Sequence, residues 1–243
     1  MGELLMLLPI VVPVLFWAGY HYHKDRHLPE PPGNLLICFL LGGLAAVLAR
    51  AMYVSLDAVD LRFDAFLLAE TNPVALFAYA MLAIGPIEEL SKLLPFVVVV
   101  LRFRAFNEPI DGIIYASFIG LGFAAAENLY YLNFLTPFEA VARGFASPVV
   151  HILFASIWGH WIGTAALQRS RRLQSAAIGL LLAAGLHGFY DFVVLLNPAW
   201  ALPIAAVLIG AIWIWRLQLL HVLHLDAVQN AAERSPVPGP RAD

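Results

Sequence analysis

Ionisable side chains interrupt the most apolar parts of this chain. The segment GPIEELSK places Glu88, Glu89 and Lys92 between two apolar runs. Other apolar stretches contain Glu127, His151, His187 and Asp191. Because a charge inside a membrane costs about 2.5–3.5 kcal/mol to insert, these side chains are candidates for function.

Helical spacing groups several of these side chains. Glu88 and Lys92 are four residues apart and share a helix face, while Glu89 lies three residues from Lys92. His187 and Asp191 are also four apart, so they project from one face of their own helix. The spacing therefore predicts local clusters that the fold must bring together.

The residue types indicate metal chemistry. Carboxylates and imidazoles are ligands for a divalent cation, and we expect zinc. A catalytic zinc takes three protein ligands, leaves one position for water and activates that water as a nucleophile. A separate carboxylate can act as the general base. Lys92 could neutralise the neighbouring glutamates or stabilise the oxyanion that forms when the carbonyl is attacked.

Each cluster also has a structural interpretation. Glu88, Glu89 and Lys92 could form a buried ion pair between helices, and Glu127 could be protonated or pair with Lys92. His187 and Asp191 could form a hydrogen-bonded pair that orients two helices. The zinc-protease signature HExxH is absent from the sequence.

The composition predicts an all-α bundle that crosses the membrane repeatedly. Of 243 residues, 61% are hydrophobic and 13% are charged, against about 25% charged in soluble domains. About seven spans are long enough to cross a bilayer. They cover about 4–20, 35–54, 73–101, 110–132, 147–167, 174–196 and 198–216. No basic patch indicates nucleic acid, and Cys38, the single cysteine, excludes an internal disulfide.

Loop charges predict the orientation. The cations lie after spans one, three, five and seven, and the alternate loops are poor in them. They are Lys24, Arg26, Arg102, Arg104, Arg169, Arg171, Arg172 and Arg216. The positive-inside rule then places the N-terminus outside and the C-terminus inside. We expect one transmembrane domain over 1–225 and a disordered cytoplasmic tail over 226–243.

Span boundaries and interruptions follow from proline. Pro73, Pro109, Pro148 and Pro198 each lie near the expected first turn of a span. Pro86, which follows Gly85, cannot donate to the carbonyl four residues earlier, so it predicts a kink in the span 73–101. A re-entrant segment ending near residue 84 is the alternative, and we prefer one kinked helix.

The ionisable side chains of the different spans are expected to lie at similar depths in the membrane. At 1.5 Å per residue, they lie about 20 to 25 Å from the cytoplasmic ends of their spans, in the outer half of the membrane. Small residues flank them, including Gly159, Gly163, Gly185 and Gly188. Because small residues let helix backbones approach closely, we expect four spans to share one polar layer.

Three motifs in order resemble the PrsW family of bacterial intramembrane metalloproteases. They are Glu-Glu-x-x-Lys at 88–92, Phe-x-x-x-Glu at 123–127 and His-x-x-x-Asp at 187–191. The resemblance covers about 72–196. It extends to the CAAX-processing type II proteases, which have Glu-Glu-x-x-x-Arg, Phe-x-x-x-His and His-x-x-x-Asn/Asp.

The resemblance implies metal-dependent cleavage of a membrane-anchored, single-span protein such as an anti-sigma factor. Cleavage would occur near the extracytoplasmic side of the bacterial cytoplasmic membrane. By analogy Glu88 is the general base, and Glu127 and His187 are metal ligands. His151 joins the ligands because of its depth alone. Lys92 and Asp191 complete the expected catalytic set, and Glu89 is either a helper or a second ligand.

Two other classes of function fit the same residues. A cation or proton transporter or channel would use the carboxylates to line a path, but a path needs polar groups at several depths. A non-catalytic scaffold would use the polar layer for structure alone. The concentration of these groups in one layer favours the protease.

Overall fold

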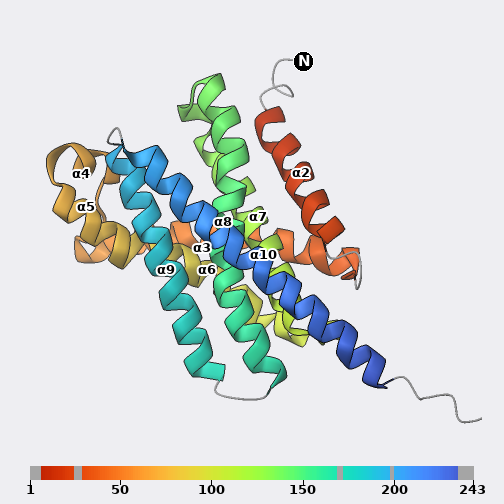
Figure 1. Cartoon of the computed structure of the whole chain (residues 1–243). Coiled ribbons are helices and arrows are strands. Elements are labelled where there is room, and N and C mark those ends of the chain that lie inside the picture. The colour runs from red at the N-terminus through yellow and green to blue at the C-terminus, as the bar shows by residue number, and fades with distance from the viewer. Residues whose placement is uncertain (1–6, 25–28, 169–171, 198–199, 235–243) are drawn as a thin grey trace, which may run out of the picture.

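The chain forms a bundle of helices in a computed structural model that describes residues 7–24, 29–168, 172–197 and 200–234. No strand occurs in these ranges. The α-helices, labelled in Figure 1, are α2 (Leu8–Lys24), α3 (Pro32–Ser55), α4 (Ala65–Thr71), α5 (Pro73–Tyr79), α6 (Gly85–Val98), α7 (Pro109–Tyr131), α8 (Pro137–Leu167), α9 (Arg172–Leu196) and α10 (Ala201–Arg234). The predicted all-α class is confirmed.

Five segments are long and apolar enough to cross a membrane. They are Pro32–Val59, Pro109–Phe134, Pro137–Leu167, Leu173–Leu196 and Ala201–Leu225. Two further expected spans differ: α2 has 17 described residues, and the segment containing α6 carries Glu88, Glu89 and Lys92. The count of seven spans and the orientation of the termini stay predictions.

Local capping explains where the central helices begin. α7 starts with a capping box of Glu108 and Asp111, and α8 with one of Thr136 and Glu139. α8 therefore begins at Pro137, before the predicted start of its span, and Pro148 lies inside the helix. The prediction that Pro148 marks a first turn was wrong, because the capping box starts the helix earlier. Pro198 lies outside the described residues.

α7 lies at the centre of the bundle, between α3 and α8 (Figure 1). Its contact with α8 is very close: a Cβ added to Gly112 would lie 2.3 Å from the Gly159 carbonyl oxygen. Toward α3, a Cβ on Gly122 would lie 1.9 Å from the Phe39 carbonyl oxygen. Glycine thus fixes both interfaces, as small residues do in membrane bundles. Cys38 is fully buried in this core.

The interruption predicted beside Pro86 is present as a π-helical turn. Residues Ala80–Ile84 join α5 to α6, and the Gly85 N–H donates to the Ala80 carbonyl, five residues back. The backbone stays helical through the junction, which agrees with one interrupted helix rather than a re-entrant segment. Such turns are frequent at functional sites, and this one lies directly before Glu88.

The last helix corrects two expectations. Arg216, predicted to be a loop cation, lies inside α10 with 1% of its surface exposed. Its guanidinium donates to Ser156 and Ser117 at 2.9 and 3.0 Å, so it joins α10 to α8 and α7. α10 also runs to Arg234, so helix continues into the predicted disordered tail, and residues 235–243 lie outside the described ranges.

Two glycines of α9 provide a test of how closely the π-helical turn Ala80–Ile84 and α9 must approach. A Cβ on Gly188 would lie 2.4 Å from the Ala80 carbonyl oxygen, whereas one on Gly185 would meet only Met81 Cε at 3.9 Å. We expect Gly188→Ala to destabilise the protein by about 1–3 kcal/mol through overpacking. Gly185→Ala, the matched control, should be neutral or stabilising by up to about 1 kcal/mol. Thermal unfolding in detergent measures both, and equal melting temperatures would contradict the close packing.

Candidate active site

The structure brings all the sequence-predicted site residues into one contact network. α6 carries Glu88, Glu89 and Lys92, α7 carries Glu127, α8 carries His151, and α9 carries His187 and Asp191. Their contacts link the four helices through the distances described below. The predicted convergence of these side chains from four helices is therefore a feature of the fold, and their environments differ.

Glu89 has a donor at both carboxylate oxygens. Its Oε1 atom lies 2.7 Å from Lys92 Nζ and 2.7 Å from His187 Nδ1. Its Oε2 atom accepts a hydrogen bond from Trp158 Nε1 at 2.9 Å. Glu89 and Lys92 are both 0% exposed. Since Glu89 is fully buried and fully paired, it holds neighbouring groups in place and is poorly placed to receive a proton from water.

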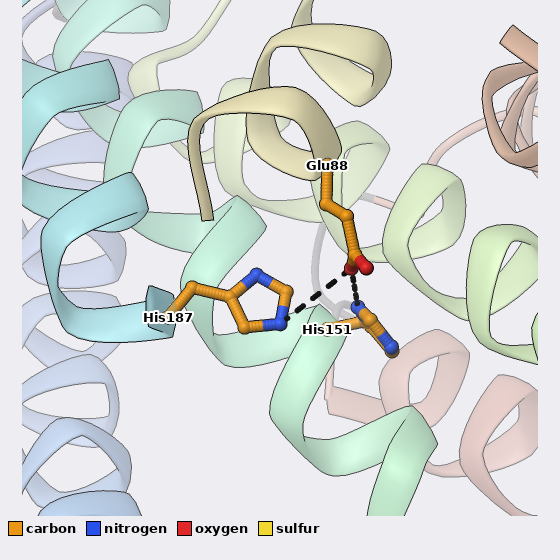
Figure 2. A group of neighbouring side chains, drawn as sticks. All are labelled: Glu88, His151 and His187. Carbon is orange, nitrogen blue, oxygen red and sulfur yellow. Dashed lines mark ion pairs between the residues drawn. The ribbon is translucent and has the colours of Figure 1, made fainter. Parts of the chain in front are cut away.

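Glu88 has the opposite environment. Its Oε1 atom accepts a hydrogen bond from the Tyr53 hydroxyl at 3.2 Å, but its Oε2 atom is buried and has no hydrogen-bond partner. Oε2 lies 3.7 Å from His187 Nε2 and 4.0 Å from His151 Nδ1. Figure 2 shows the carboxylate directed at both imidazole rings. A buried oxygen without a donor is costly, so this atom needs a proton or a cation.

His151 is held at both ring nitrogens. Lys92 Nζ lies 2.8 Å from Nδ1, and because an ammonium group only donates, Nδ1 is the acceptor. The ring proton is therefore on Nε2, which donates to Glu127 Oε2 at 2.9 Å. Arg143 Nη2 contacts the same Glu127 oxygen at 2.9 Å. Glu127 thus fixes the orientation of His151 and is itself neutralised by Arg143.

His187 is oriented by the same principle. Glu89 accepts the proton of Nδ1, and Nε2 faces Glu88 and Asp191 Oδ2, the latter at 3.5 Å. The Phe154 ring stacks on the imidazole, with centroids 4.7 Å apart and an interplanar angle of 26°. The ring is therefore held by a hydrogen bond at one edge and by packing on one face.

The exposed fractions of the side chains indicate where the site is accessible from outside the bundle. The side chains of Glu127, Asp191 and Arg143 are 20%, 22% and 33% exposed, in contrast to the enclosed Glu89 and Lys92. These partly exposed residues come from the end of α7, the first half of α8 and the end of α9. A substrate would therefore approach from that end of the bundle, where Asp191 is an accessible carboxylate.

The residues fit a divalent cation. Glu88, His151 and His187 each offer one ligand atom, and the three atoms lie within 4.8 Å of one another. Tetrahedral zinc, with bonds of about 2.0–2.2 Å, holds its ligand atoms about 3.3 Å apart, so small side-chain shifts would suffice. Lys92 contacts the same His151 nitrogen, and a cation there would leave Lys92 paired with Glu89 alone.

Sequence reasoning missed four residues of the site. Arg143, Phe154 and Trp158 lie on α8 at spacings of eight, three and seven from His151, which places them on one helix face. That periodicity could have identified them. Tyr53 comes from α3, outside the motif region, and no local pattern in the sequence connects it to Glu88.

Comparison with known proteins assigns the chain to a family. Residues 30–217 match the model described as PrsW family intramembrane metalloprotease. The chain belongs to the PrsW family. The match extends beyond the motif region in both directions and includes all of α3, the helix that contributes Tyr53.

Curated relatives support the same PrsW assignment. The chain is 28% identical over 214 residues to Protease PrsW of Clostridioides difficile (strain 630), covering 86% of this chain and 87% of that protein. It is 30% identical over 204 residues to Protease PrsW of Geobacillus kaustophilus (strain HTA426), covering 84% and 85%. Over 192 residues it is 27% identical to Protease PrsW of Bacillus subtilis (strain 168), covering 78% and 83%. No solved structure matches the chain.

Membership of the PrsW family determines the broad function. The chain is an intramembrane protease, a hydrolase of peptide bonds, and a multi-pass membrane protein of bacteria. This class favours the protease prediction over the transporter and scaffold alternatives. It leaves the metal, the roles of the individual residues and the substrate to be inferred from the site.

Proposed function

We propose that the chain is a zinc-dependent intramembrane endopeptidase whose metal is held by Glu88, His151 and His187. One observation carries this proposal: Glu88 Oε2 is buried without a hydrogen-bond donor and faces ring nitrogens of both histidines. A cation between these atoms would satisfy Glu88 Oε2 and would take the place of Lys92 at His151 Nδ1. The proposal therefore assigns Glu88 to the ligands, where the resemblance alone implied a general base.

The residues around the three ligands support this assignment. Histidines that bind metals usually donate their other ring nitrogen to a carboxylate or carbonyl. Glu89 accepts from His187 Nδ1, and Glu127 lies at His151 Nε2. Glu127, expected as a ligand, is thus proposed to orient His151. Each histidine has its own carboxylate, and each carboxylate has its own cation, Lys92 or Arg143.

The remaining residues of the site are assigned separate roles in hydrolysis. When bound, zinc supplies hydroxide at neutral pH and polarises the carbonyl under attack. Asp191 lies beside His187 Nε2 and is partly exposed, so we assign it to accept a proton from the attacking water and return it to the leaving amine. Lys92 neutralises Glu89, which keeps two adjacent carboxylates from repelling each other in a medium of low dielectric constant.

The setting of the site supports a proposal for the substrate class. The polar network is enclosed by apolar helices and opens at one end of the bundle, so a peptide bond in or beside the bilayer would reach it. We propose a single-span membrane protein, such as an anti-sigma factor, cleaved near the extracytoplasmic side of the bacterial cytoplasmic membrane. The loop cations other than Arg216 support that side, and the family supports the protein substrate.

Metal content tests the proposal directly. Protein purified in detergent should contain about one zinc ion per chain by elemental analysis, and His187→Ala should contain almost none. His160→Ala is the matched control, because His160 lies on α8 and makes none of the site contacts described above. Chelation should stop cleavage of a co-reconstituted single-span protein, and added zinc should restore it. Cleavage by protein shown to be metal-free would exclude the proposed mechanism.

A further inference from the structure

We propose that Tyr53 of α3 is a positioning residue of the active site, which orients Glu88 so that its second oxygen faces the two histidines. This inference rests on the proposed function. The phenol hydroxyl lies 3.2 Å from Glu88 Oε1, and among the described residues it is the one hydrogen-bond donor to that carboxylate. Lys92 Nζ, at 3.9 Å from Oε2, is too distant to donate.

A glutamate side chain without such a contact would not keep this orientation. Glutamate has three rotatable side-chain torsions, and the last of them is broad, so the carboxylate turns easily. Fixing Oε1 removes that freedom and leaves Oε2 directed at His187 and His151. The hydroxyl also lies 3.4 Å from the carbonyl oxygen of Ile84, one turn before Glu88. Tyr53 therefore holds the carboxylate against its own helix.

The Tyr53 ring is itself held in place. It packs against a second apolar cluster of Ala45, Ala49, Ile87 and Phe123. This cluster joins α3 to α6 and α7. It lies beside the site, because Ile87 directly precedes Glu88 and the centroid of the Phe123 ring lies 4.2 Å from Lys92 Nζ. The tyrosine therefore acts from a packed helix–helix interface.

The contact between α3 and α7 sets where that interface lies. A Cβ on Gly42 would lie 2.1 Å from the Ile119 carbonyl oxygen, so the two backbones approach as closely as glycine permits. Tyr53 is near the end of α3, eleven residues beyond Gly42 and on the side of the helix that meets Glu88. α3 thus places the Tyr53 hydroxyl beside a site whose other residues come from α6, α7, α8 and α9.

Removing the hydroxyl alone tests the inference. Tyr53→Phe keeps the ring and its packing, so we expect its melting temperature to stay within a few degrees of wild type. Its affinity for Zn²⁺, measured on metal-free protein by competition with a chelator, should fall about 10- to 100-fold. With a cleavable single-span protein, kcat should fall and KM should stay unchanged. Tyr79→Phe is the matched control, because Tyr79 lies nearby on α5 and packs on Phe63.

The outcomes separate this inference from the proposed function. If wild type binds zinc and cleaves, and Tyr53→Phe matches it in both, Tyr53 does not position Glu88. A lower melting temperature with unchanged zinc affinity and kcat would make the tyrosine structural and overturn the inference as well. If wild type cleaves without binding zinc, the proposed metal is wrong, while a fall in kcat specific to Tyr53→Phe would still support the positioning of Glu88.

Discussion

Glu88→Gln is expected to abolish cleavage and to lose zinc while the protein stays folded. Glutamine has the shape of glutamate, and its amide oxygen can still accept the Tyr53 hydrogen bond. The variant removes a negative ligand, so we expect less than a tenth of the wild-type zinc content. Cleavage should fall about 10³-fold or more, as when an essential catalytic group is removed. Elemental analysis, melting temperature and the rate of cleavage measure the three effects.

The same variant distinguishes two roles for Glu88. Full zinc content with no cleavage would make Glu88 the general base that the family resemblance implies. Normal zinc content together with normal cleavage would show that Glu88 neither binds the metal nor takes part in catalysis. Glu70→Gln is the control, because Glu70 is an exposed carboxylate on α4 and should change none of the three measurements.

Glu89→Ala is expected to destabilise the protein by about 3–5 kcal/mol, because it leaves the fully buried Lys92 charge without its partner. The variant also removes the acceptor of Trp158 Nε1 and of His187 Nδ1. The surface pair Arg62–Asp57 has the same 2.7 Å separation, with side chains 48% and 55% exposed. Asp57→Ala should therefore cost only about 0–1 kcal/mol.

A double variant separates the structural role of Glu89 from its role in the site. Glu89→Ala with Lys92→Met removes both buried charges, so most of the lost stability should return. Zinc affinity should stay low, because His187 still lacks the carboxylate that orients its ring. A double variant that recovered both stability and zinc affinity would show that Glu89 serves only to balance Lys92. Thermal unfolding and chelator competition provide the two readouts.

Local patterns in the sequence determine much of the site. The spacing of Glu88, Lys92, His187 and Asp191 placed pairs on single helix faces because an α-helix repeats every 3.6 residues. The same periodicity, with loop charge and span length, predicted that four helices would share one polar layer. Capping motifs are also local signals: the capping box of Thr136 and Glu139 starts α8 before the predicted span of 147–167.

Tertiary structure decided the rest. Which carboxylate meets which imidazole depends on the rotation of each helix about its axis, and that rotation is set where glycines such as Gly122 and Gly188 let backbones touch. The paired environment of Glu89, the burial of Arg216 and the contact of Tyr53 with Glu88 all arise this way. The sequence by itself determined that carboxylates and imidazoles would lie on facing helices. Only helix packing decided that Glu88 Oε2 would lie near both histidines without a hydrogen-bond donor. The spacing of residues along one helix carries no information about how the neighbouring helix is rotated.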